Sequence, residues 1–195
     1  GRRMENKENI LKCALDLFYA KGYDAVGVQE IAEKAGITKP TLYYYFGSKY
    51  GLLETLLTTK FKVFRERFER VAYYNGNVTE TLNRIAADYV DYAVNDQKFY
   101  MLLMSMFYLP RENEMYKAAQ PLIKEFFRII VKVFEDAREQ LGNMNNREKQ
   151  FAIGFIGLLN YYLIMVCEEN DGKQIDISEE TIRSLVHQFM HGINS

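Results

Sequence analysis

Apolar residues recur at intervals of three and four along almost the whole chain, and this spacing is typical of amphipathic helices. The clearest run has its apolar positions at Leu52, Leu53, Leu56, Leu57, Phe61, Phe64, Phe68 and Val71. The alternation expected of half-buried strands is nearly absent, and only 3 Pro and 12 Gly interrupt the 195 residues. The sequence therefore predicts an all-α fold.

Glycine, proline and polar capping residues divide the chain into a predicted nine-helix architecture. Three short helices come first, over about 10–21, 28–35 and 38–46. Six longer ones follow, over about 48–71, 77–95, 97–109, 112–141, 147–170 and 178–191. Four residues are suited to cap a helix N-terminus, namely Thr38, Ser48, Asn77 and Ser178. Pro121 should kink the seventh helix or start a new one.

Charge is unevenly distributed although the net charge is only −1. Residues 1–62 hold ten Lys or Arg and seven Asp or Glu, so this part carries +3 and the remainder −4. Any nucleic-acid contact must therefore be local and lie in the front of the chain. We expect two domains, one over 1–48 and one over 49–195.

The second and third short helices are separated by Gly36-Ile37-Thr38, which is the spacing of a helix-turn-helix. The small Ala32 and Ala35 allow the two helices to approach closely. On the third helix, Leu42 and Phe46 lie one turn apart and should face inward. The side chains left to point outward are Lys39, Thr41, Tyr43 and Tyr44. The N-terminus of this helix also favours phosphate, because its backbone N–H groups have no helical partner.

The segment from Gly22 to Lys49 resembles the N-terminal domain of the tetracycline-repressor (TetR/AcrR) family. The matching pattern is the Ile31-Ala32 pair, the Ala35-Gly36 turn, then Leu42-Tyr43-x-x-Phe46 followed by Lys49. The specific match covers about residues 5–57. The rest agrees only in length, helix number and lack of motifs. The resemblance implies an N-terminal helix-turn-helix DNA-binding domain and a C-terminal helical ligand-binding and dimerisation domain.

By this resemblance, the base contacts would come from Lys39, Pro40, Thr41 and Tyr45. The phosphate contacts would come from Tyr43, Tyr44 and Lys49, while Thr38 caps the helix and touches the DNA backbone. The family usually has Thr or Ser at the positions of Val26 and Gly27, so a contact there must come from the Gly27 N–H. Taken alone, three consecutive tyrosines are more often packing residues, and it is the whole pattern that favours DNA.

Helix-turn-helix modules usually act in pairs, with one module on each of two half-sites, so we expect a homodimer. Both of the last two helices are strongly apolar, and Gly154 and Gly157 permit close helix approach. The predicted interface residues are Phe151, Phe155, Leu158, Leu159, Tyr162, Leu185 and Phe189. The alternative is that these residues form an intrachain core. The resemblance points to the same two helices.

A ligand pocket is implied mostly by the resemblance, and an aromatic- and Met-rich set on the middle helices suits a largely apolar or aromatic effector. The candidates are Tyr89, Tyr92, Tyr100, Met104, Phe107, Tyr108, Phe126, Phe127 and Tyr161. For any one of them, core packing is the more common role. Three carboxylates could neutralise a cationic ligand, Asp88, Asp91 and Glu168, although solvated carboxylates are the default.

The functional hypothesis is a ligand-responsive repressor that binds a (pseudo)palindromic operator and is released by a small molecule. Alternatives are an activator of the same fold, and a helical small-molecule or lipid-binding protein without DNA activity. His187 and His191 have metal-ligand spacing, which leaves a helical metalloenzyme as a weaker rival. We expect no enzyme activity, cofactor, metal or membrane span. The polar start and two isolated cysteines favour the cytoplasm.

Overall fold

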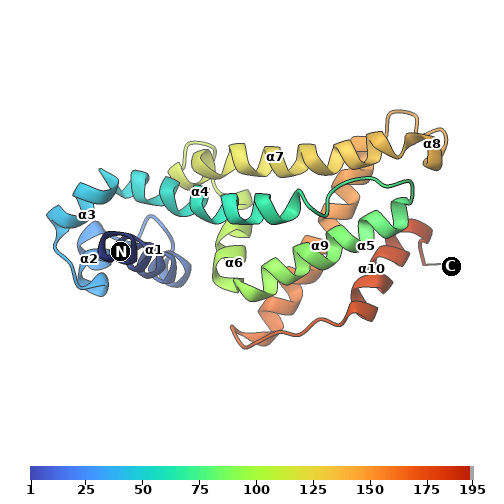
Figure 1. Cartoon of the computed structure of the whole chain (residues 1–195). Helices are drawn as coiled ribbons and strands as arrows, with labels where there is room; N and C mark the ends of the chain where they lie inside the picture. The colour runs from blue at the N-terminus through green and yellow to red at the C-terminus, as the bar shows by residue number, and fades with distance from the viewer. Residues whose placement is uncertain (194–195) are drawn as a thin grey trace. The chain divides into compact units, whose positions relative to one another are not determined.

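A computed structural model describes residues 1–193 and contains ten α-helices and one 3-10 helix, with no strand among these residues. Figure 1 labels the α-helices along the chain. In order they are α1 (Arg2–Lys21), α2 (Val28–Ala35), α3 (Lys39–Phe46), α4 (Lys49–Phe68), α5 (Val78–Asn95), α6 (Gln97–Ser105), the 3-10 helix η1 (Met106–Tyr108), α7 (Glu114–Asp136), α8 (Arg138–Leu141), α9 (Glu148–Asn170) and α10 (Glu179–His191). The prediction of an all-α fold is confirmed.

The predicted count of nine helices is wrong, because the segment expected to form one helix over 112–141 forms two. Ala137 leaves helical geometry between them, with φ −88° and ψ 7°, so α7 ends and the short α8 begins. Pro121 lies inside α7 without ending it. The predicted sixth helix is also shorter than expected, since its last turn tightens into η1.

All four predicted N-caps are confirmed by hydrogen bonds. The side-chain oxygens of Thr38, Ser48, Asn77 and Ser178 accept from the backbone N–H groups of Thr41, Gly51, Glu80 and Thr181 respectively, at 3.3, 2.9, 3.0 and 3.1 Å. Each bond satisfies a donor that the helix itself leaves unpaired. These caps explain why the starts of α3, α4, α5 and α10 were predicted to within one residue.

The chain forms two compact units. Unit 1 comprises residues 1–62 and 98–121, and unit 2 comprises 63–97 and the residues from 122 onward. Both α4 and α7 contain residues of each unit. In unit 1, α2 packs against both α1 and α3. In unit 2, α5, α9 and α10 pack against one another (Figure 1). The predicted division into functional domains at residue 48 stays a prediction.

An aromatic cluster fills part of the core of unit 2. The rings of Phe64, Phe68, Tyr89, Tyr92 and Phe126 contact one another with centroid distances between 4.9 and 6.2 Å. Such offset and tilted pairs are the preferred geometries of aromatic side chains.

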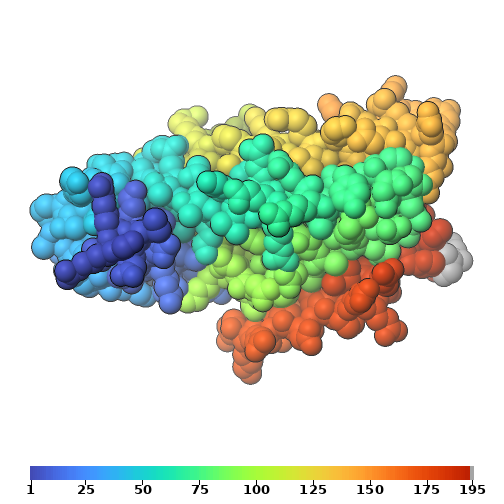
Figure 2. All heavy atoms as spheres, in the orientation of Figure 1, coloured from blue at the N-terminus to red at the C-terminus, as the bar shows by residue number. Residues whose placement is uncertain are grey.

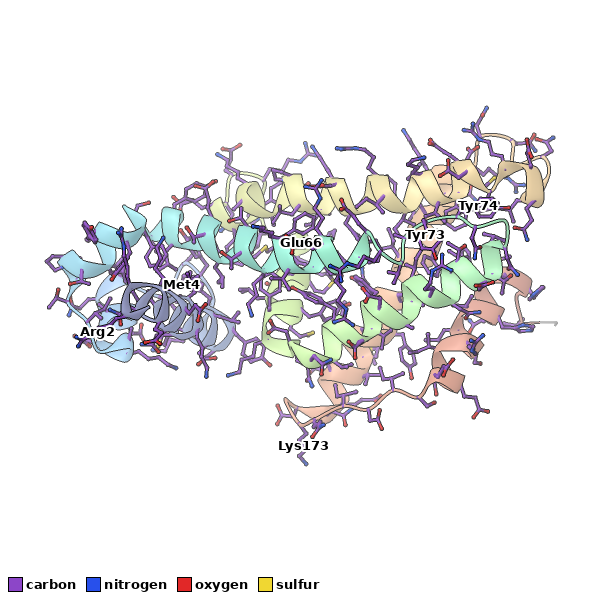
Figure 3. All side chains as sticks on the ribbon, in the orientation of Figure 1. Arg2, Met4, Glu66, Tyr73, Tyr74 and Lys173 are labelled. Atoms are coloured by element: carbon purple, nitrogen blue, oxygen red, sulfur yellow. The ribbon has the colours of Figure 1, made fainter. Side chains whose placement is uncertain are left out.

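The connection that follows α4 is held to α5 by one arginine. The Arg84 guanidinium donates to the carbonyl oxygens of Val71 and Tyr73, at 3.0 and 2.6 Å. It also lies 4.1 Å from the centre of the Tyr73 ring, which is labelled in Figure 3.

Gly51 allows a close approach at the junction of α3 and α4 that the sequence analysis did not foresee. A Cβ atom at this position would lie 2.1 Å from the carbonyl oxygen of Phe46. Real Cβ atoms do not come so close to backbone, so only glycine fits without a shift of the chain. The first turn of α4 is therefore pressed directly onto the end of α3.

We predict that Gly51→Ala lowers the free energy of unfolding by about 1–3 kcal/mol, as overpacking usually does. The direction of this change distinguishes a tight junction from an ordinary helix position, because Ala stabilises an ordinary helix interior by about 1 kcal/mol relative to Gly. Urea unfolding followed by circular dichroism measures the change. Glu54→Ala, on the exposed side of the same helix, is the control and should stay within about 0.5 kcal/mol. An unchanged or higher midpoint for Gly51→Ala would show that the junction is not tight.

Candidate nucleic-acid interface

The turn between α2 and α3 is fixed by backbone hydrogen bonds around Gly36. Gly36 has φ 71° and ψ 30°, the left-handed conformation that glycine adopts most readily. Its N–H donates to the Glu33 carbonyl at 3.1 Å, and the Ile37 N–H donates to the Ala32 carbonyl at 3.0 Å. This paired arrangement is a Schellman motif, which ends α2 and sets the direction of the chain into α3.

The two faces of α3 differ sharply in exposure. Leu42 is fully buried and Phe46 nearly so, whereas Tyr44 is 72% exposed and Tyr43 is 40% exposed. Lys39 and Pro40 are exposed as well, while Thr41 and Tyr45 are half-buried. The predicted inner pair is confirmed. The outer face presents an ammonium group, hydroxyl groups and aromatic edges, which are donors and apolar surfaces suited to a duplex.

Two cations from α1 lie beside aromatic rings of α3, and the sequence analysis missed them. The Arg3 guanidinium is 5.6 Å from the centre of the Tyr44 ring, and the Lys7 ammonium is 5.9 Å from that of Phe46. The helix that carries them is the dark-blue segment in Figure 2, and Figure 3 labels Arg2 on it. The signal available in the sequence was the cluster of basic residues one to two turns before Ile10. Their proximity to α3 needed the tertiary fold.

Lys49 is held at the start of α4 by an aromatic ring. Its ammonium lies 4.0 Å from the centre of the Tyr23 ring, within the range of a cation–π interaction. Burial lowers the pKa of Lys49, while the carboxylates of Asp24 and Glu114 oppose that shift. The Tyr23 hydroxyl donates to the Glu114 carboxylate. Burial, followed by this bond, raises the pKa of Tyr23. Lys49 therefore has a defined position next to α3.

Gly27 stands at the N-cap of α2 with extended backbone and is exposed. Because glycine has no side-chain hydroxyl, Gly27 makes no side-chain cap at the start of α2. The nine predicted DNA-contact residues all belong to unit 1, on the α2–α3 segment and the first residue of α4. Their contacts with DNA stay a prediction.

The structure distributes the predicted ligand residues over both units. Tyr89, Tyr92 and Phe126 belong to the aromatic cluster of unit 2, and burial raises the pKa of Tyr92. Tyr100 and Met104 are buried in unit 1, and Phe127 is half-buried. The remaining three are exposed: Phe107, Tyr108 and Tyr161. They do not gather at one place as a set.

Two of the three carboxylates proposed for a cationic ligand already have a partner. Arg67 donates to Asp88 through Nε at 2.6 Å and to Asp91 through a terminal nitrogen. The other oxygen of Asp88, Oδ2, is buried without a hydrogen-bond partner among the described residues. Burial accordingly raises the pKa of Asp88, and Arg67 opposes that shift. Glu168 is exposed.

Several predicted dimer residues lie in the core of their own chain. Phe134 of α7 contacts the rings of Phe151, Phe155 and Phe189, with centroid distances of 6.1 to 6.5 Å. Leu159 is buried too, whereas Leu158, Tyr162 and Leu185 are half-buried. The apolar residues that α9 exposes are others, namely Ile153, Tyr161 and Met165.

Among residues 1–193, the histidine pair has no further candidate metal ligands. The rings of His187 and His191 lie 4.5 Å apart on α10. Within residues 1–193, no group of three or more His, Cys, Asp or Glu side chains is placed to hold a metal ion. Cys13 and Cys167 are both buried, and burial raises the pKa of each thiol.

Sequence comparison identifies regulators as relatives. Residues 10–56 match the family described as bacterial regulatory proteins, tetR family. The HTH-type transcriptional regulator YdgC of Bacillus subtilis is 29% identical over 128 residues, which span 64% of this chain and 65% of YdgC, just under two thirds of its length. The activator FasR of Mycolicibacterium smegmatis is 24% identical over 80% of this chain and 69% of its own. The repressor BdcR of Escherichia coli is 46% identical over 50 residues, covering 26% of this chain and 25% of its own.

Solved structures share the fold over nearly the whole chain. A putative fatty acid metabolism regulator of Clostridium perfringens superposes with a TM-score of 0.81 at 19% identity, covering 95% of this chain and 98% of its own. FadR of Bacillus subtilis, in complex with stearoyl-CoA, gives 0.78 at 18% identity, with 95% and 98% covered. AibR, in complex with isovaleryl coenzyme A and operator DNA, gives 0.72 at 19% identity, with 94% and 97% covered.

We predict that Lys39→Ala weakens binding to the best selected duplex by about 1–3 kcal/mol, the usual effect of losing one base contact. Folding should be unaffected, because Lys39 is exposed. Fluorescence anisotropy with labelled duplexes measures the affinity. Lys132→Ala removes the same charge from an exposed position on α7 and should bind as the unmodified chain does. Equal losses in the two variants would mean that only net charge matters.

Proposed function

We propose that the chain, whose residues 10–56 match the tetR family of bacterial regulatory proteins, binds a (pseudo)palindromic operator as a homodimer and releases it on binding a small effector. The observation that carries the proposal is the division of α3. Leu42 and Phe46 anchor the inner face of α3 in the core, so that Lys39, Tyr43 and Tyr44 on the outer face can enter a major groove. A cytoplasmic protein acting on DNA fits this role.

The apolar surface of α9 supports the homodimer. This helix is long and apolar enough to cross a membrane by length and composition, and only 28% of its most apolar stretch is buried in the chain. Ile153, Tyr161 and Met165 lie exposed on it. A second copy of the chain would cover the same face symmetrically, as in most homodimers. Two reading helices would then meet two half-sites.

The effector we propose is an acyl-CoA. Two proteins that share this fold hold stearoyl-CoA and isovaleryl-CoA. In this chain, unit 2 offers an aromatic core for an acyl group. The unpartnered Oδ2 of Asp88 is an acceptor that an amide N–H of the pantetheine arm could meet. To release DNA, the effector must bind the non-operator conformation more tightly than the operator-bound one. The signal would pass along α4, which starts at Lys49 and contains residues of both units.

We predict that Gly157→Arg yields a monomer with an intact fold. A Cβ atom at Gly157 meets nothing within 4 Å in the chain, so a larger side chain disturbs only what lies outside it. Analytical ultracentrifugation gives the mass, and circular dichroism checks the fold. Thr59→Arg, exposed on α4, adds the same charge elsewhere and should leave a dimer. A dimer in both variants would place the interface off this face of α9.

Operator selection from random DNA with the purified chain tests the function directly. We predict that the selected sequences carry two inverted half-sites, and that affinity for them falls steeply with salt. Selection of no consensus would favour the alternative of a ligand-binding protein without DNA activity.

We predict that stearoyl-CoA or isovaleryl-CoA lowers operator affinity, while coenzyme A without an acyl group has no effect. A reporter gene placed behind the selected operator then gives the sign of regulation. Expression that rises when the gene for this protein is deleted indicates a repressor. Expression that falls indicates an activator, which is what the name of the relative FasR says of that protein. Full affinity in the presence of both acyl-CoA esters would exclude this effector class.

A further inference from the structure

Unit 1 contains a cavity of about 520 Å³ that none of the proposed contacts uses. It lies where the end of α1 and the following turn face α6, Leu109 and the start of α7. Its volume is in the range of ordinary small-molecule sites. The walls are mostly apolar and include Phe18, Tyr23, Met101, Leu102, Leu109 and Met115. Methionine walls adapt readily to irregular ligands.

The charged groups around this cavity already have partners within the protein. Lys21 pairs with Glu30, and Asp24 accepts a hydrogen bond from the Asn113 side-chain amide at 2.9 Å. Ser105 is exposed at the cavity, and its hydroxyl donates to the Leu102 carbonyl, which leaves its oxygen able to accept. Both charged groups therefore already have a partner, and the lining favours an uncharged, mainly apolar molecule with at most one donor group.

One wall of the cavity is connected to the DNA-reading surface. Tyr23 contributes to the lining, and the same ring lies 4.0 Å beneath the Lys49 ammonium. Glu114, which accepts the Tyr23 hydroxyl bond, comes directly before Met115 of the lining. Tyr23 has only 4% of its surface exposed, so its ring has little room to move within the protein. A ligand that pushes this ring aside therefore also breaks its contact with the Lys49 ammonium.

We propose that this cavity is a binding site for a small uncharged apolar molecule, and that its occupation weakens operator binding by moving Tyr23 away from Lys49. The site is distinct from the acyl-CoA site suggested for unit 2, since an acyl-CoA carries several negative charges that this lining does not match. The inference rests on the proposed DNA binding by α3 and Lys49.

Chemical tethering tests the site without knowledge of the natural ligand. The variant Ser105→Cys is treated with hexyl methanethiosulfonate, so that the new thiolate displaces methanesulfinate and carries a hexyl group on a disulfide into the cavity. Methyl methanethiosulfonate is the small-group control, and the treated unmodified chain controls for the buried Cys13 and Cys167. Tyr108→Cys, 88% exposed on η1 and outside the lining, is the positional control. Mass spectrometry confirms single labelling.

The hexyl group on Ser105→Cys should lower operator affinity by roughly 5- to 150-fold, the range of ordinary allosteric couplings. The methyl group and the Tyr108→Cys adduct should leave affinity unchanged. In a Lys49→Ala background, measured at low salt, the effect of the hexyl group should largely disappear.

Two results would overturn the proposal. One is full operator affinity with the hexyl group attached. The other is an equal loss with and without Lys49, which would show that the group perturbs the domain by another route. Failure of the proposed function looks different, because the unlabelled Ser105→Cys protein would then select and bind no operator at all.

Discussion

The turn at Gly36 is the constraint on which the reading surface depends. Its left-handed backbone and two hydrogen bonds, to Glu33 and Ala32, end α2 and direct the chain into α3. A residue with a Cβ is strained there, and any other exit direction would turn Leu42 and Phe46 away from the core. Because these two side chains are buried, the opposite face of α3 is left to solvent, and with it the groups proposed to meet DNA.

The end of α3 is as tightly defined as its beginning. Gly51 lets the first turn of α4 press against the Phe46 carbonyl, and the Lys49 ammonium in the same turn lies 4.0 Å from the centre of the Tyr23 ring. Tyr23 in turn bonds to Glu114 at the start of α7. Lys49 therefore joins the proposed DNA contacts to residues far away in the sequence. A change in this group of side chains would reach the operator without any change in α3 itself.

Local signals made much of the fold predictable. The caps at Thr38, Ser48, Asn77 and Ser178, the Gly36 turn and the Leu42/Phe46 pair were all recognisable in the sequence, because each depends on residues within a few positions. The contacts of Arg3 with Tyr44 and of Tyr23 with Glu114 were not, since they join segments whose approach only the tertiary fold decides. The same reason explains why Phe155 was predicted for a dimer interface yet packs on Phe134. An apolar helix face does not reveal which neighbour covers it.

The central claim is that two copies of α3 read two successive major grooves. Dimethyl sulfate methylates guanine N7 in the major groove, so protection of the selected duplex by the bound chain tests this claim most directly. We predict two protected patches, one in each half-site, with centres separated by about one helical turn of 10–10.5 base pairs or a multiple of it. A bound duplex whose guanines all remain reactive, or one with a single protected patch, would contradict it.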